Sequence, residues 1–281
     1  MFAKINIFFD FLKSILQSRI MIVSMVKNDF KVKYASSALG ITWAFIQPLV
    51  QMLVIIFVFT VGLKAGPTPT GIAFAPWLVC GLVPWNFFAD AVTNGTNSLV
   101  EYSYLVKKVV FRTSILPVVK TLSSLIVHIV FIGILFATTL CFRITPTLYT
   151  LQVLFYLPCI IFLIFGLNWL CAALGVFFKD IAQLINVFLQ LFVWLTPIMW
   201  DKSKIADKFF QVGPLNISLL KVFKLNPIFY IVDGYRDAFT GSVWFWEKPF
   251  WTTYFLCFSA LTFVLGATIF HKLRPHFSDV L

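Results

Sequence analysis

Six runs of the sequence contain no Asp, Glu, Lys or Arg over at least 20 consecutive residues. They are Tyr34–Leu63, Ala65–Ala89, Thr121–Phe142, Ile144–Phe178, Ile181–Trp200 and Pro249–His271. A helix needs about 20 apolar residues to cross the hydrocarbon core of a bilayer, and a backbone in lipid must satisfy its own hydrogen bonds. The runs therefore predict an all-α membrane protein with six transmembrane helices.

The composition agrees with a single membrane domain. Only 12% of the residues are charged, against roughly 25% in a soluble domain, which is too little charge to cover a water-facing surface. We expect one transmembrane domain over residues 1–281. Its parts are a cytoplasmic interfacial segment (1–33), spans one to five (34–200), an outer segment (201–248), the last span (249–271) and a cytoplasmic tail (272–281).

The net charge of +11 reflects orientation in the membrane rather than binding to nucleic acid. Six Lys and Arg residues precede the first run and three lie within residues 92–114, whereas the opposite short loops hold only Lys64 and Arg143. Positive residues gather on the cytoplasmic side of membrane proteins. We therefore expect both termini and residues 92–114 in the cytoplasm and 201–248 outside.

Two segments between the runs have predicted roles of their own. Residues 3–17 place apolar side chains on one helical face, which predicts an amphipathic helix lying on the membrane surface. The outer segment holds Pro214, Pro227 and apolar stretches too short to span (Phe209–Leu220 and Leu225–Val232), which predicts re-entrant helices.

The chemistry of an enzyme is not visible in the spans. They hold no paired carboxylates and no His-Glu-x-x-His pattern, and His128 is interpreted as an interior histidine. The sequence contains no Gly-x-x-x-x-Gly-Lys phosphate loop. We expect no catalytic residues, no metal and no cofactor bound by this chain. A permease driven by a separate motor is favoured; a membrane-embedded glycosyl- or acyltransferase is the alternative.

Three stretches resemble the membrane subunits of type-2 ABC exporters of polysaccharides, the O-antigen, capsule and teichoic-acid permeases. The first runs from Lys31 to Trp43 and on to Gln47-Pro48. The second is Pro84-Trp85-Asn86-Phe87-Phe88 with Leu105–Arg112 and Leu116-Pro117. The third is Asn226-Pro227 with Tyr235-Arg236. Their order and spacing make the resemblance extend over the whole chain.

The resemblance implies a homodimeric permease in the bacterial cytoplasmic (inner) membrane, working with two copies of a separate ABC ATPase that binds ATP and Mg. Its implied substrate is a lipid-linked polysaccharide; a type-2 exporter of a lipid or drug is the alternative. Residues Glu101–Arg112 are implied to form the coupling helix that contacts the ATPase. The expected contact residues are Glu101, Tyr104, Leu105, Lys107, Lys108, Phe111 and Arg112.

Two further sets of residues are candidates for substrate binding. The cations before the first span suit the phosphates of a lipid-linked sugar, although contact with anionic membrane lipid would also explain them; these are Arg19, Lys27, Lys31 and Lys33.

Trp43, Gln47 and Gln51 recur every four residues on span one, as Asn186, Gln190 and Trp194 do on span five, so each set lies on one helix face. We expect these faces, with Phe45, to line a glycan channel. A helix interface bonded through polar side chains is the alternative.

Overall fold

A computed structural model describes residues 17–35, 38–69, 71–107, 112–212, 215–241 and 243–281. Helices make up most of the described chain, with one two-stranded hairpin. The elements are α2 (Arg19–Ala35), α3 (Trp43–Phe57, followed by a π-helical turn at Val58–Gly62), α4 (Phe74–Glu101), α5 (Ser103–Val106), α6 (Ile115–Cys141), α7 (Val153–Phe177), α8 (Asp180–Leu195), β1 (Phe209–Val212), β2 (Leu215–Ser218), α9 (Leu219–Lys224), α10 (Pro227–Thr240), α11 (Pro249–Leu273) and α12 (Phe277–Val280).

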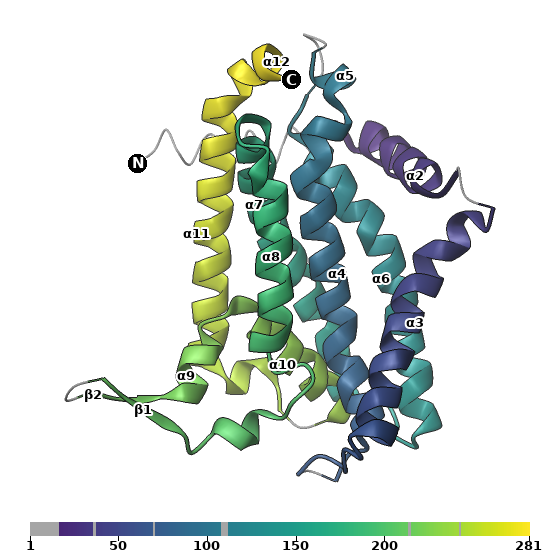
Figure 1. The fold of residues 1–281 in the computed structure, drawn as a ribbon, viewed down its shortest axis with the longest axis vertical. Helices are drawn as coiled ribbons and strands as arrows, with labels where there is room; N and C mark the ends of the chain where they lie inside the picture. The colour runs from purple at the N-terminus through teal and green to yellow at the C-terminus, as the bar shows by residue number, and fades with distance from the viewer. Residues whose placement is uncertain (1–16, 36–37, 70, 108–111, 213–214, 242) are drawn as a thin grey trace.

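The long helices run alongside one another as a bundle, with α4 at its centre (Figure 1). Helix α4 packs against α6, α7 and α10, and α7 packs along α11. Helices α2, α5 and α12 lie at one end of the bundle, and the hairpin, α9 and α10 lie at the other (Figure 1). The two ends therefore differ in architecture, as expected for a protein whose faces meet different compartments.

The prediction of an α-helical membrane protein is confirmed. Within the described residues, four helical segments are long and apolar enough to cross a bilayer: Gly40–Gly62, Ile115–Cys141, Leu148–Phe177 and Pro249–Val280. Helix α4 is long but polar in its second half, and α8 is an apolar helix of 16 residues. The count of six spans stays a prediction.

Two helices continue beyond the uncharged runs that predicted them. The run ending at Ala89 continues in α4 to Glu101, and α6 begins at Ile115 rather than at Thr121. The residues that bounded the runs, Asp90 and Lys120, lie inside these helices and form ion pairs. A charged side chain with an ion-pair partner is tolerated inside an apolar helix, whereas an unpaired one is costly. Asp90 and Lys120 therefore do not mark the ends of α4 and α6.

Helix α2 lies at the end of the bundle opposite the hairpin (Figure 1). The amphipathic helix predicted over residues 3–17 falls almost entirely outside the described residues. The basic stretch from Arg19 to Lys33 forms α2 and packs against α6. Ile22 and Val26 are buried, whereas Ile20 and Val23 are exposed, so both sides of α2 carry apolar side chains and no single stripe marks it.

The expectation of re-entrant helices in the outer segment is wrong for its first half. Phe209–Val212 pairs antiparallel with Leu215–Ser218, in the register Phe209 to Ser218, so the stretch Phe209–Leu220 is mostly a hairpin. Gly213-Pro214 in its middle disfavours a continuous helix. The second half does form a helix, α10. Its amino end is capped by Asn226, whose side-chain oxygen accepts a hydrogen bond from Ile228 N at 3.1 Å.

Buried Arg236 connects α10 to other elements at the hairpin end of the bundle. Its guanidinium donates hydrogen bonds to the carbonyl oxygens of Pro197 and Ile198, at 2.5 and 2.8 Å, and lies 3.5 Å from the centre of the Trp77 ring. Arg236 thus joins α10 to α4 and to the chain that follows α8. Arg236 belongs to the third stretch of the resemblance, and these contacts give it a structural role.

Replacing Arg236 with lysine should destabilise the protein. A lysine cannot supply the planar fork of donors, so buried carbonyl groups lose their partners at a cost of about 1–3 kcal/mol. Thermal unfolding of the purified protein in detergent would measure this for Arg236→Lys. Arg274→Lys, at an exposed arginine, is the matched control and should unfold like the wild type. Equal stability of the two variants would contradict the role given to Arg236.

Candidate functional site

A pocket of about 460 Å³ lies between α3, α4 and α6, with α2 at one side. This volume lies within the usual range for small-ligand sites, about 300–1,000 Å³. The lining residues are Lys33, Trp43, Ala44, Gln47, Pro48, Gln51, Val83, Trp85, Asn86, Phe87, Ala89, Asp90, Asn94, Ser124, Val127, His128 and Phe131. The first two stretches of the resemblance, far apart in sequence, meet in this pocket.

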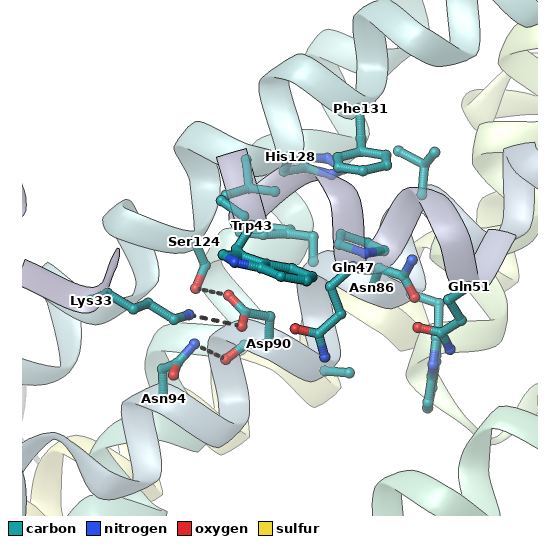
Figure 2. A pocket seen from close by; sticks show the side chains of 17 residues that line it. Lys33, Trp43, Gln47, Gln51, Asn86, Asp90, Asn94, Ser124, His128 and Phe131 are labelled. Atoms are coloured by element: carbon teal, nitrogen blue, oxygen red, sulfur yellow. Dashed lines mark hydrogen bonds and ion pairs between the residues drawn. The ribbon is translucent and has the colours of Figure 1, made fainter. Parts of the chain in front are cut away.

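Helix α3 supplies one wall of the pocket. Trp43, Gln47 and Gln51 follow one another at intervals of four residues and turn toward the same space as Asn86 (Figure 2). The three α3 residues are exposed in the single chain, so the pocket opens to its surroundings. The predicted grouping of these three side chains on one helix face is found in the structure.

Helices α4 and α6 supply the opposite walls. Phe87 stacks on the imidazole ring of His128, with 4.5 Å between the ring centres. His128 Nε2 lies 2.9 Å from the hydroxyl oxygen of Tyr235 on α10. His128 is therefore an interior histidine bonded to a neighbouring helix, as the sequence indicated. The Nδ2 atom of Asn86 is buried and has no hydrogen-bond partner among the described residues.

An ion pair lies at the α2 side of the pocket (Figure 2). Lys33 Nζ is 3.2 Å from Asp90 Oδ1, and both side chains remain partly exposed, at 34% and 44%. Ser124 donates a hydrogen bond of 2.5 Å to the other oxygen of Asp90. The pocket thus combines a cation, a carboxylate, amides and aromatic rings, a set suited to a ligand that is polar and has flat apolar faces.

The other candidate residues do not line this pocket. Phe45 is half-buried and packs against the core, and Asn186, Gln190 and Trp194 lie on α8. Gln190 and Trp194 are exposed, Trp194 by 61%. Asn186, Gln190 and Trp194 are called the α8 row below, and Trp43, Gln47 and Gln51 the α3 row. Within the single chain the α3 row lines the pocket and the α8 row does not. Arg19, Lys27 and Lys31 are exposed on α2 outside the pocket, and Lys33 alone of the four candidate cations lines it.

The expected coupling segment is described only in part. Glu101 ends α4, and the four residues of α5 include Tyr104, which is 58% exposed, and Leu105, which is half-buried. A continuous helix over Glu101–Arg112 is not found, because Tyr102 leaves the helical conformation, with φ −101° and ψ 28°. Lys107 and Arg112 are exposed, and Lys108 and Phe111 lie outside the described residues.

An ion-pair network, which the sequence did not reveal, connects α2, α4 and α6; Lys120 and Asp29 are buried in it, whereas Glu101 is 47% exposed. Lys120 Nζ lies 2.7 Å from Asp29 Oδ1 and 2.5 Å from Glu101 Oε2. The Tyr102 hydroxyl donates a hydrogen bond of 2.7 Å to Asp29. Burial by itself would raise the pKa of Asp29, but the bonds from Lys120 and Tyr102 hold that pKa below its ordinary value. The network connects Glu101, at the start of the expected coupling segment, to α2.

A second charged cluster lies at the hairpin end of the bundle, on and beside α10 (Figure 1). Lys248 is bonded to Asp233 and Asp237 of α10, and Lys202 is also paired with Asp233. Both carboxylates have ammonium partners here. Within the described residues no group of three or more His, Cys, Asp or Glu side chains is arranged to hold a metal ion.

Comparison with known proteins identifies the relatives of this chain. A family model described as "ABC-2 type transporter" matches residues 21–240. An O-antigen export system permease protein, RfbA, of Klebsiella pneumoniae is 25% identical over 266 residues, which cover 93% of this chain and 95% of the relative. The protein of the same name from Myxococcus xanthus is 27% identical over 229 residues, covering 81% and 83%.

Removing Lys120 should loosen the packing of α2 on α6. Lys120→Met leaves the buried Asp29 without its cation, which typically costs about 3–5 kcal/mol. We expect a lower melting temperature and faster tryptic cleavage after Lys27 and Lys31, because α2 loses its anchor on α6. The exposed Lys272 offers a matched control, Lys272→Met. Unchanged cleavage of α2 in Lys120→Met would show that the network does not hold this helix.

Proposed function

The chain belongs to the ABC-2 type transporter family, and from this premise we propose that it is the permease subunit of an ATP-driven exporter of a lipid-linked polysaccharide. It is a multi-pass membrane protein and a transport subunit, whose matched domain is a permease rather than an ATPase. ABC-2 permeases pair with ATPase subunits. The proposed substrates are O-antigen, capsular polysaccharide or teichoic acid.

The observation that carries the proposal is the match over nearly the whole chain to relatives named as O-antigen export permeases. The pocket supports it independently. Aromatic rings suit the apolar C–H faces of sugars, and amide side chains suit hydroxyl groups. Trp43 and Trp85 lie in the pocket with Gln47, Gln51 and Asn86.

The proposed assembly is a homodimer with two ATPase subunits in the bacterial cytoplasmic membrane. Six helices, α3, α4, α6, α7, α8 and α11, are the proposed spans, with both termini in the cytoplasm. The domain is divided as the sequence indicates, with residues 1–33 inside, 201–248 outside and 272–281 inside. Supporting this orientation, α2 with its basic residues and α12 lie at the same end of the bundle (Figure 1).

A dimer also gives a role to the side chains that the single chain leaves exposed. Gln47 on α3 and Gln190 on α8 are exposed in the single chain, although amide side chains are unfavourable in lipid. We propose that the α3 row and the α8 row face a conduit formed where two subunits meet. Phe45, which was expected in this lining, packs against the core on the other side of α3 and is not part of it. A lining of uncharged polar side chains would allow a hydrated glycan to pass but would give ions little electrostatic stabilisation.

Export should depend on the segment after α4. In cells that carry the chain with its cognate ATPase, Lys107→Glu combined with Lys108→Glu should lower surface glycan at least tenfold without preventing membrane insertion. The added carboxylates would repel an acidic docking groove on the ATPase. The exposed Lys64 near the other end provides the control, Lys64→Glu, which should export normally. Full export by the double variant would refute the coupling role.

The same cells test the function itself. Deleting the chain should remove a lipid-linked glycan from the surface and leave it in the inner leaflet. If instead the glycan persisted on the surface and a lipid or drug accumulated in the cell, the alternative type-2 exporter would replace the proposal.

The orientation is testable by cysteine labelling. On a cysteine-free background, Asn216→Cys in β2 should react with a membrane-impermeant maleimide in intact cells, whereas Lys272→Cys should react only after lysis. Both residues are exposed in the structure, so reagent access depends on the side of the membrane. The reverse pattern would invert the proposed topology.

A further inference from the structure

The hairpin β1–β2 extends away from the bundle at the end where α9 and α10 lie (Figure 1). Its register pairs Phe210 with Ile217 and Gln211 with Asn216. Because successive residues of a strand point to opposite faces, the apolar pair lies on one face of the hairpin and the amide pair on the other. Phe210 is 65% exposed and Ile217 is 37% exposed. The described residues therefore leave an apolar face of the hairpin largely uncovered.

The hairpin has little support from the rest of the chain. A two-stranded hairpin by itself is at best marginally stable in water. At its base, Leu219 N donates a hydrogen bond of 2.9 Å to the carbonyl oxygen of Lys208, and β2 packs on α9. Phe209, beside this bond, is also exposed, on the face that Gln211 shares. Exposed aromatic side chains on so small an element indicate a partner outside the single chain.

The base of the hairpin lies at the level where α11 begins. The Tyr254 hydroxyl donates a hydrogen bond of 2.7 Å to the carbonyl oxygen of Leu225, and Lys224 Nζ lies 5.1 Å from the centre of the Trp251 ring. Helix α9, which follows β2 directly, is thus held beside the first two turns of α11. Pro249–Val280 is long and apolar enough to cross a bilayer, so its first turns meet the bilayer surface.

Other exposed side chains at this level are typical of a membrane interface. Trp246 is exposed just before α11, Phe250 is exposed in its first turn, and Val222 is exposed on α9. Aromatic side chains gather at the headgroup level of membrane proteins. These side chains and the apolar face of the hairpin therefore suit the same environment, the boundary between headgroups and acyl chains.

The charge around the hairpin distinguishes a lipid partner from a second copy of the hairpin. Residues 201–225 contain five lysines and two aspartates, and Lys204, Lys208 and Lys221 are exposed on either side of the hairpin in the sequence. Two hairpins that met about a two-fold axis would bring these lysines together, and like charges repel. Anionic headgroups attract lysines that lie close to the membrane surface.

We propose that the β1–β2 hairpin is an interfacial anchor that binds the anionic lipid leaflet at its end of the bundle. The face of Phe210 and Ile217 rests on the acyl chains, and the three exposed lysines contact headgroup phosphates. The strand edges stay among headgroups and water, because unpaired backbone groups are too costly in hydrocarbon. Asn216, on the opposite face, stays in water, as the labelling of Asn216→Cys requires.

The proposal is tested on the full chain in nanodiscs, without ATPase or glycan. On the cysteine-free background, Phe210→Cys and Gln211→Cys each carry an environment-sensitive fluorophore. Lipids with a spin label on the acyl chain quench a fluorophore that lies at the boundary with the headgroups. Quenching should be about threefold stronger at Phe210→Cys than at Gln211→Cys, because neighbouring strand residues point to opposite faces.

Two spin-labelled lipids, phosphatidylglycerol and phosphatidylcholine, test the charge at equal mole fraction. The fluorophore at Phe210→Cys should be quenched about twofold more by phosphatidylglycerol, because the lysines gather anionic headgroups. Replacing Lys204, Lys208 and Lys221 together with glutamine should abolish this preference. Lys64→Gln, at an exposed lysine between α3 and α4, is the matched control and should retain it. Melting temperatures show that the variants are folded.

Each opposite result overturns the proposal. Equal quenching by lipid at Phe210→Cys and Gln211→Cys would show that the hairpin does not rest on the bilayer by one face. Quenching at Phe210→Cys by aqueous iodide instead of lipid would leave the hairpin in water, and protection from both quenchers would place a second copy of the chain on it. An equal response to the two lipids would refute the role of the lysines. Because no substrate or ATPase is needed, the result is independent of the proposed function.

Discussion

The buried contact between Lys120 and Asp29 is the interaction on which the position of α2 depends. Lipid offers no partner to a charged group, so a lysine within an apolar helix must be neutralised by the protein itself. Two carboxylates neutralise Lys120: Asp29 on α2 and Glu101 at the end of α4. These contacts hold α2 against the bundle. They also hold Lys33, one helical turn after Asp29, beside the pocket.

The fold was largely predictable from the uncharged runs, because lipid penalises isolated charges strongly enough to mark spans in a sequence. The boundaries of α4 and α6 were not predictable, because Asp90 and Lys120 are charged residues whose ion-pair partners make them tolerable inside a helix. A single sequence does not show that residues 57 or 91 positions apart form such pairs. The hairpin at Phe209–Ser218 was missed because short apolar stretches fit strands and helices alike.

The candidate site was predictable on one side only. The interval of four residues from Trp43 to Gln51 identified the α3 wall, since helix geometry alone places these side chains together. The facing residues Asn86, Asp90 and Ser124 come from two other helices, and their proximity depends on tertiary packing. The resemblance in Pro84–Phe88 did contain a signal, because Asn86 is the polar residue in an aromatic stretch. Gln190 and Trp194 of the α8 row are exposed in the single chain, and the role proposed for this row depends on a second subunit.

The central claim is that this chain, together with a separate ATPase, moves a lipid-linked glycan across the membrane. Proteoliposomes that hold the purified chain and its cognate ATPase, with a lipid-linked glycan added to one leaflet, test it directly. A glycan-cleaving enzyme on the ATP side reports how much glycan has crossed. The account predicts that protection from this enzyme appears only with ATP, with both proteins and with a hydrolysis-competent ATPase. Protection that develops equally without the ATPase, or no protection although ATP is hydrolysed, would contradict it.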